Sequence, residues 1–351
     1  MRCELHTITS IKDFDALECA WRELENGRDM TAFQTYEWNR LLLEEFFGLL
    51  YNRLFAEVRC YVVTEDHKAL AILPVIIQKR NAKIMWWGRK KGTYILGEGS
   101  WSDYLNFIYQ EPNAQAWELI LNDLPKPLFF NSLRSNTELC QFLKDRSDAN
   151  GQHPSVHVPL MSDAADYGAS LSKSVRQNLR TAMNRMNKAG LTYELRIEDG
   201  KLDASLANEL VRMHYDRAKI KNQKKYKKNL HWISRNLRNC YKEYQNRQYN
   251  IIYHSMISNV YGVTVIVYLN GVPAGYMYGM RDLDAVRVMH NCIKEEYNFY
   301  SPMFRGAYDF ICQEITDKRY NVKQIDFTRG NENYKFQLGG EVLPLHNYSI
   351  R

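Results

Sequence analysis

The chain has 351 residues, a formal net charge of +7 and seven cysteines. Hydrophobic residues make up 45% and charged residues 25% of it, which is typical of a globular protein and excludes a disordered chain. The length allows two ordinary domains, each with a full core. The charge is too diffuse to indicate nucleic-acid binding, although it would suit a phosphate-rich ligand or an anionic polymer.

The cysteines are scattered, odd in number and without CxxC spacing. This pattern favours a reducing compartment over a disulfide framework or a zinc site. No window approaches the ~20 apolar residues that a membrane span needs, and the first ten residues, MRCELHTITS, lack the apolar stretch of a signal peptide. We therefore expect a soluble, cytoplasmic protein without a metal.

The first half of the chain alternates helical and strand patterns. Ser10 to Asp13 resembles a capping box, and it predicts a helix that closes at Gly27. Three further helices are predicted at Tyr36–Phe47, Ala114–Leu124 and Asn136–Arg146. Strands are predicted at Val58–Glu65, Leu70–Gln78, Lys83–Trp87, Tyr104–Tyr109 and Leu128–Leu133. The half contains no catalytic cluster, and loop packing explains Trp101 and Asp103 better than a site does.

A Gly- and Pro-containing polar stretch, Asp148–Pro159, predicts the domain boundary. We expect one domain at residues 1–155 and a second at residues 156–351. The second opens with an amphipathic helix at Ser170–Ala189, whose polar face carries Arg176 and Arg180 among other cations. That face either receives an anionic substrate or is simply solvated.

A strand at Leu191–Ile197 and a helix at Ala204–Ile220 follow. His214 and Arg217 lie one helical turn apart and project the same way, and imidazole suits proton transfer near neutral pH. A lone histidine on a helix is still more often structural. The cationic run Lys219–Lys228 predicts a solvated loop.

Three antiparallel strands are predicted next, at Val263–Leu269, Pro273–Arg281 and Ala285–Ile293, with Asn-Gly as the first turn. Ser301 and Pro302 then predict the start of a helix that runs to about Arg319, with Ser301 as N-cap and Pro302 at the first position.

The closing stretch, IDFTRGNENYKFQLGGE, predicts a short strand followed by a polar turn. It brings two carboxylates and two cations together within ten residues: Asp326, Arg329, Glu332 and Lys335. The end of a strand in an α/β sheet is where ligands usually bind. The alternative is a solvated turn with two ion pairs.

This closing stretch resembles the final motif of the CelD/BcsL-type acetyltransferases, a GNAT-like group associated with cellulose and exopolysaccharide synthesis. The basic helix at Ser170–Leu195 and the stretch VRMHYDR at Val211–Arg217 are similar to two other motifs of that family, in the same order. The ending YKFQLGG also resembles the Fem-type peptidyltransferases. The resemblance implies an α/β (α+β) fold of tandem GNAT-like domains, each a mixed, mainly antiparallel sheet flanked by helices, the first degenerate and the second an acyltransferase.

The resemblance also implies roles for particular residues. Asp326, Glu332 and Lys335 are expected to be catalytic. The residues expected to bind substrate are Arg329, Tyr334, His214, Arg217, Arg176 and Arg180. Helix start residues Tyr300, Ser301, Met303 and Phe304 are expected to hold the diphosphate of acetyl-CoA or another acyl-CoA. Met303 stands where the family pattern Y-S-P-G has glycine.

Three functions follow. The first is acyl-CoA-dependent N- or O-acyl transfer to a sugar or cell-envelope precursor, in contact with polysaccharide-synthesis machinery. The second is Fem-like aminoacyl transfer from aminoacyl-tRNA, and the third is a non-catalytic module in polysaccharide assembly. Direct transfer requires no nucleophilic cysteine or serine. We expect Lys335→Ala or Arg329→Ala to abolish transfer with less than ~1 kcal/mol of lost stability, as surface-loop changes usually do.

Overall fold

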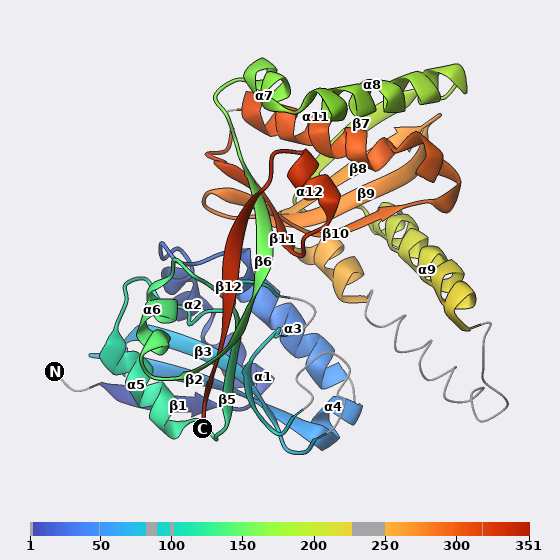
Figure 1. Ribbon diagram of the computed structural model, residues 1–351. Helices are drawn as coiled ribbons and strands as arrows, with labels where there is room; N and C mark the ends of the chain where they lie inside the picture. Colours follow the sequence, from blue (N-terminus) through green and yellow to red (C-terminus); the bar gives the residue numbers. More distant parts are fainter. Residues whose placement is uncertain (1–2, 49, 82–89, 99–101, 227–249, 318) are drawn as a thin grey trace. The chain divides into compact units, whose positions relative to one another are not determined.

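The structure is a computed structural model that describes residues 3–48, 50–81, 90–98, 102–226, 250–317 and 319–351. The chain forms two compact units (Figure 1). The first comprises Met1–Ser155 and Val342–Arg351, and the second comprises Val156–Glu341. The second domain expected from the sequence, residues 156–351, includes the last ten residues. They lie instead with the first unit, because β12 (Glu341–Ile350) pairs antiparallel with β5 (Leu128–Arg134).

The first unit is a mixed sheet with helices, in the strand order β1-β2-β3-β4-β5-β12. Its other strands are β1 (Glu4–Ile8), β2 (Ala56–Glu65), β3 (Lys68–Gln78) and β4 (Gly92–Ile95). Its helices are α1 (Ile11–Asp15), α2 (Glu18–Leu24), η1 (Ala32–Gln34), α3 (Tyr36–Gly48), α4 (Leu50–Phe55), α5 (Ala114–Asp123) and α6 (Glu138–Lys144). As predicted, Ser10 caps α1, because its hydroxyl accepts a hydrogen bond from the backbone of Asp13.

One strand prediction for the first half is wrong. Tyr104–Tyr109 is not a strand: Tyr104 has φ 56°, which interrupts an extended backbone, and Ile108 makes only an isolated bridge to Ile72. Strand β4 was not predicted, and Asp148–Pro159, which contains the division between the two units, forms strand β6. Asp103 is buried at 7% exposure. Lys83–Trp87 and Trp101 lie outside the described residues.

The second unit has the strand order β6-β11-β10-β9-β8-β7 and receives β6 from Val156 onward. Its strands are β6 (Asp148–Pro159), β7 (Tyr193–Asp199), β8 (Gly262–Leu269), β9 (Val272–Arg281), β10 (Ala285–Ile293) and β11 (Gln324–Arg329). Its helices are α7 (Ala164–Ser170), α8 (Lys173–Lys188), α9 (Ala204–Tyr226), η2 (Glu295–Tyr300), α11 (Pro302–Thr316) and α12 (Asn333–Gln337). Residues 250–258 are also helical.

The two units repeat one topology. In each, a first strand is followed by helices, then by three antiparallel strands, a helix and a strand parallel to the last of the three. The final strands are exchanged, since β12 joins the sheet of the first unit and β6 joins that of the second. The sequence shows no repeat, yet the predicted fold of paired mixed sheets flanked by helices is confirmed.

Helices cover both faces of the second sheet (Figure 1). Helix α11 packs on β7, β8 and β9 and against α7 and α8, while α9 packs on β9 and β10. The core on the α11 side includes Phe310, Ile311, Ile325 and Phe327, each at most 2% exposed. The predicted Asn-Gly turn is confirmed, with φ of 51° at Asn270 and 75° at Gly271.

The helix boundaries of the second unit differ from the prediction in three places. Helix α8 begins at Lys173 and not at Ser170, and Ser172 caps it by accepting a hydrogen bond from the backbone of Val175. Helix α9 continues to Tyr226 through residues predicted as a loop. Pro302 opens α11 as predicted, but Ser301 is left-handed, with φ 52°, and its side chain makes no capping hydrogen bond.

Candidate functional site

Strands β10 and β11 are paired in parallel over only three residue pairs, from Ala285 with Gln324 to Arg287 with Asp326. A bulge between Val288 and His290 then shifts the register of β10 against β9. Both strands continue beyond these pairs, and Thr328 Oγ1 donates to the carbonyl oxygen of Val288 at 3.1 Å. Bulges commonly re-aim side chains beside functional sites. Several of the predicted site residues lie on or next to the carboxyl-terminal ends of β10 and β11.

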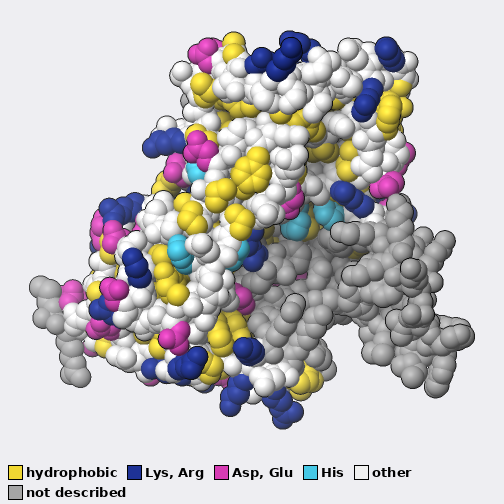
Figure 2. All heavy atoms as spheres, in the orientation of Figure 1, with side chains coloured by type: hydrophobic (Ala, Val, Ile, Leu, Met, Phe, Trp, Pro, Cys, Tyr) yellow, Lys and Arg dark blue, Asp and Glu magenta, His cyan; other side chains and the backbone are white. Residues whose placement is uncertain are grey.

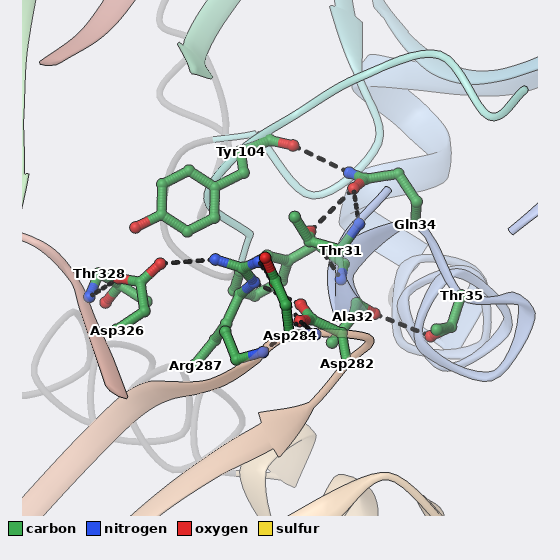
Figure 3. A network of polar contacts seen from close by, with 12 residues as sticks. Thr31, Ala32, Gln34, Thr35, Tyr104, Asp282, Asp284, Arg287, Asp326 and Thr328 are labelled. Carbon is green, nitrogen blue, oxygen red and sulfur yellow. Dashed lines mark hydrogen bonds and ion pairs between the residues drawn. The ribbon is translucent and has the colours of Figure 1, made fainter. Parts of the chain in front are cut away.

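A buried ion network fixes the paired part of these strands (Figure 3). The Arg287 side chain is 1% exposed, and its Nη1 donates to Asp326 Oδ2 at 2.6 Å while its Nε donates to Asp282. The other oxygen of Asp326 accepts from the backbone of Thr328 at 2.8 Å. Asp326 thus has both oxygens engaged, which suits a role in orienting β11 better than that of a base.

The turn after β11 is held by Lys335, which is 3% exposed. Its Nζ donates to the carbonyl oxygen of Arg329 at 2.7 Å and pairs with Glu332 Oε2 at 2.9 Å. Gly330 has φ 109°, and the Glu332 carboxylate occupies the space where a Cβ would stand. Partial burial would raise the pKa of Glu332, but the hydrogen bond and charge of Lys335 outweigh it and lower that pKa. Glu332 therefore stays ionised.

Tyr334 connects α12 to β10. Its hydroxyl accepts a hydrogen bond from Asn291 Nδ2 at 3.1 Å, and its ring meets Phe327 edge-on. Burial raises the pKa of this phenol, so it remains protonated and able to donate. Asn291 follows the bulge and was not predicted as a site residue.

On the α9 side of the sheet, three side chains form a polar cluster: His214, Tyr276 and His290. His214 Nδ1 lies 2.8 Å from the Tyr276 hydroxyl, and the two imidazole rings are 5.8 Å apart between centroids. Burial lowers the pKa of His214 to about 3, helped by the charges of His290 and Arg217, and burial lowers the pKa of His290 to about 4. Both rings are therefore neutral at pH 7.

Arg217 extends this cluster toward solvent. Its side chain is exposed on α9, and it hydrogen-bonds to Cys292, which is 1% exposed. Burial raises the pKa of the Cys292 thiol more than Arg217 lowers it. The thiol is therefore a structural contact of the cluster and not an activated nucleophile.

The predicted donor-binding residues lie at the start of α11. Met303 covers β9: a Cβ built on Gly275 would lie 2.6 Å from Met303 Cγ and Sδ. Phe304 packs partly against the core. The N–H groups in the first turn of a helix have no intrahelical partner, and Ser301 does not cap them by its side chain.

The two predicted arginines of α8 differ. Arg176 Nη1 donates to the carbonyl oxygens of Ala169 and Leu171, at 2.6 and 2.7 Å, and so joins α7 to α8. Arg180 is exposed on the outer face of α8. No hydrogen bond described here joins Arg176 or Arg180 to His214 or to Lys335.

The structure therefore divides the predicted residues into groups. Glu332, Tyr334 and Lys335 belong to the turn after β11, and His214 and Arg217 lie on the α9 side of β10. Sequence reasoning missed Tyr276, Arg287, His290 and Asn291. The broken alternation of AVRVMHNCI in β10 is the signal that could have revealed the bulge and the polar residues beyond it.

This arrangement of strands and helices is the GNAT fold, and the similarity of the chain to a family model and to solved structures supports this assignment. Residues 173–336, somewhat less than half of the chain, match the family model described as "Acetyltransferase (GNAT) domain". No functionally curated protein is similar enough in sequence to be matched. The chain is also similar to a conserved protein of unknown function from Bacteroides thetaiotaomicron, with 12% identity, a TM-score of 0.57 and all of both chains covered.

Two further similar structures carry functional names. One is FemX, with 10% identity and a TM-score of 0.57 over 99% of this chain and 97% of that one. The other is the C-terminal domain of a putative lysylphosphatidylglycerol synthetase from Agrobacterium fabrum, with 9% identity and a TM-score of 0.52 over 97% and 92%. These likenesses support the fold alone. In the part of the chain that the structure describes, no helix has the length and apolar character required to cross a membrane.

Proposed function

We propose that the second unit transfers an acyl group from a carrier to an amine or hydroxyl of a sugar or cell-envelope precursor. The observation that carries this proposal is the bulge in β10 beyond its short parallel pairing with β11, within the segment that matches an acetyltransferase model. Polar groups follow the bulge: Asn291 with Tyr334 across to α12, and His290 with His214 on the α9 side.

Direct transfer requires a group that accepts the proton of the attacking nucleophile. The acceptor nitrogen or oxygen bonds to the carbonyl carbon, the carrier bond breaks, and the proton leaves the attacking atom while the departing carrier gains one. His290 and His214 are neutral at pH 7, and since the same low pKa makes them weak bases, they would accept a hydrogen bond from the nucleophile and not hold its proton. Glu332 is the ionised alternative within the predicted set, and the Tyr334 hydroxyl would serve the departing carrier.

Acyl-CoA is the first candidate carrier. Its diphosphate would lie against the first turn of α11, near Tyr300, Ser301, Met303 and Phe304, where backbone N–H groups and the helix dipole favour an anion. Tyr300 and Ser301 precede the first turn, and Pro302 supplies no N–H. The backbone groups of Met303 and Phe304 would therefore do most of the binding.

The second candidate carrier is aminoacyl-tRNA. The specific observation that favours it is Met303, which occupies the position of a family glycine and packs over Gly275 at the helix start. The similarity to FemX over nearly the whole chain is compatible with this alternative but supports the fold only.

Thermal unfolding tests the two carriers side by side. A ligand at 100 times its Kd stabilises by about 2.7 kcal/mol, or a few degrees. Acetyl-CoA at millimolar concentration should raise the melting temperature, and Met303→Gly should increase that rise if the side chain restricts the diphosphate. A rise with aminoacyl-tRNA alone would select the second carrier. If neither ligand acts and no labelled acyl group moves from either carrier to a panel of amino sugars, the unit is a non-catalytic module and the proposal fails.

A further inference from the structure

Helix α8 has a charge pattern that does not serve its own stability. Its sequence, KSVRQNLRTAMNRMNK, carries five cations and no carboxylate, although the whole chain has 40 acidic residues beside 47 basic ones. Arg176 and Arg180 are like charges at i and i+4, a spacing that destabilises a helix. Lys173 and Arg176 also stand near the amino-terminal end, where the helix dipole disfavours cations.

The cations lie on the solvent side of the helix. Val175, Leu179, Ala182 and Met186 are buried and form the inner face. Lys173, Arg180, Arg185 and Lys188 are exposed, and the side chains exposed between them are serine or amides. Figure 2 shows dark blue Lys and Arg side chains along the edge of the molecule formed by α8. The outer face of α8 is therefore uniformly cationic or neutral over about 24 Å, at 1.5 Å per residue.

An exposed aromatic residue borders this face. Phe299 of η2 is 65% exposed, and the Arg185 guanidinium lies over its ring at 4.5 Å while donating to its carbonyl oxygen at 3.0 Å. Burial does not explain an aromatic ring held in this position. Helix η2 also carries Glu295 and Glu296, but Glu295 accepts a hydrogen bond from Asn298 and the two do not match the five cations of α8.

We propose that the outer face of α8, together with Phe299, docks the protein onto an anionic phospholipid bilayer. Cations on one helical face are attracted to the negative surface potential of such a membrane, and an aromatic ring inserts at the headgroup level. The exposed face of a single helix also suits a plane, whereas single-stranded nucleic acid is usually held in a groove. Docking would bring the second unit to lipid-linked envelope precursors, but the inference stands independently of the acyl carrier.

The test is co-sedimentation of the full-length protein with vesicles. Vesicles of equal parts phosphatidylglycerol and phosphatidylcholine should bind the protein, vesicles of phosphatidylcholine should not, and high salt should release it. The triple variant Lys173→Gln, Arg180→Gln, Lys188→Gln should lose roughly a hundredfold in vesicle partition, since each cation near an anionic surface contributes about fivefold to the partition coefficient. Phe299→Ser should weaken binding to the acidic vesicles at low salt.

A matched control removes the same charge elsewhere. Lys68, Lys201 and Arg212 are exposed on β3, before α9 and on α9, and their replacement by glutamine should leave vesicle binding within twofold or so, because the face itself is intact. Unchanged melting temperatures would show that all variants are folded. The proposal is overturned by failure to bind the acidic vesicles or by equal loss in the control. It is equally overturned if an RNA oligonucleotide of the same total charge displaces the protein from the vesicles, which would make the face a nucleic-acid site.

Discussion

Lys335 Nζ donates a hydrogen bond of 2.7 Å to the main-chain carbonyl oxygen of Arg329, which joins two residues expected to bind or activate a substrate. Lys335 is 3% exposed, so the expectation that it can be replaced like a surface-loop residue does not fit the structure. Its ammonium group satisfies buried carbonyl oxygens at the end of β11. The turn that carries Glu332 depends on it.

Lys335→Met should therefore lower the free energy of unfolding by about 1–3 kcal/mol, because the carbonyl oxygens of Thr328 and Arg329 lose their charged donor. Denaturant unfolding measures the change. The control is Glu332→Gln, whose carboxylate is 58% exposed and which should cost at most about 1 kcal/mol. Equal stability of wild type and Lys335→Met would show that the lysine does not hold the turn.

Arg287→Met should destabilise the protein more strongly, by about 3–5 kcal/mol, because it leaves the buried carboxylates of Asp282 and Asp326 without their cation. Arg319→Met is the control: that arginine is 68% exposed and pairs with Asp317, so its loss should cost about 0–1 kcal/mol. Unfolding midpoints in urea compare the two. If Arg287→Met were as mild as the control, the buried network would contribute little to the second unit.

The elements of the second unit could be read from sequence because their patterns are local. Strands β8 and β9 are joined by Asn270 and Gly271, a residue pair typical of a tight hairpin turn, and Pro302 marks the start of a helix. The hydrogen bond from Lys335 to the carbonyl oxygen of Arg329 could not be predicted, because a lysine near carboxylates in the sequence is typical of a solvated surface and its burial depends on the tertiary fold. Asp326 likewise appears available until Arg287, 39 residues earlier, is placed against it.

The strand exchange lies beyond any local pattern. Asp148–Pro159 reads as a linker because it contains Gly151 and Pro154, yet it forms a strand whose last residues belong to the second unit. His290 was missed for a related reason: the bulge at Val288 changes which face of β10 each later residue occupies. The site residues named from single motifs therefore stay predictions, and tertiary contacts change the roles expected of Asp326 and Lys335.

The pH dependence of stability should report the two buried imidazoles. In the folded protein the pKa of His214 is about 3 and that of His290 about 4, both below the unfolded value near 6.5. Between these values the unfolded chain binds protons that the folded chain does not, so stability is full above pH 6.5 and falls as the pH drops toward 4.

The Tyr276 hydroxyl, from β9, lies within hydrogen-bond distance of His214, and the charge of Arg217, on α9, adds to the effect on His214. The double variant His214→Gln, His290→Gln should flatten the loss of unfolding free energy between pH 6.5 and 4, with carboxylate titration remaining. His254→Gln serves as the control, because it makes the same substitution at a histidine outside this cluster, and the slope should be unchanged. An unaltered slope in the double variant would contradict the assignment of neutral, buried rings.

Gly275 and Met303 should be energetically coupled. A methyl group at Gly275 would stand 2.6 Å from Met303 Cγ and Sδ and 2.8 Å from the carbonyl oxygen of Cys292. Gly275→Ala should therefore lower the free energy of unfolding by about 1–3 kcal/mol through overpacking. Gly48→Ala, where nothing lies within 4 Å of the added atom, should be close to neutral.

Adding Met303→Ala to Gly275→Ala should recover only part of the lost stability, because the shorter side chain at position 303 makes room while the backbone of β10 does not move. Full recovery would mean that Met303 alone fills this space, and no loss from Gly275→Ala would mean that α11 does not pack on β9 as described.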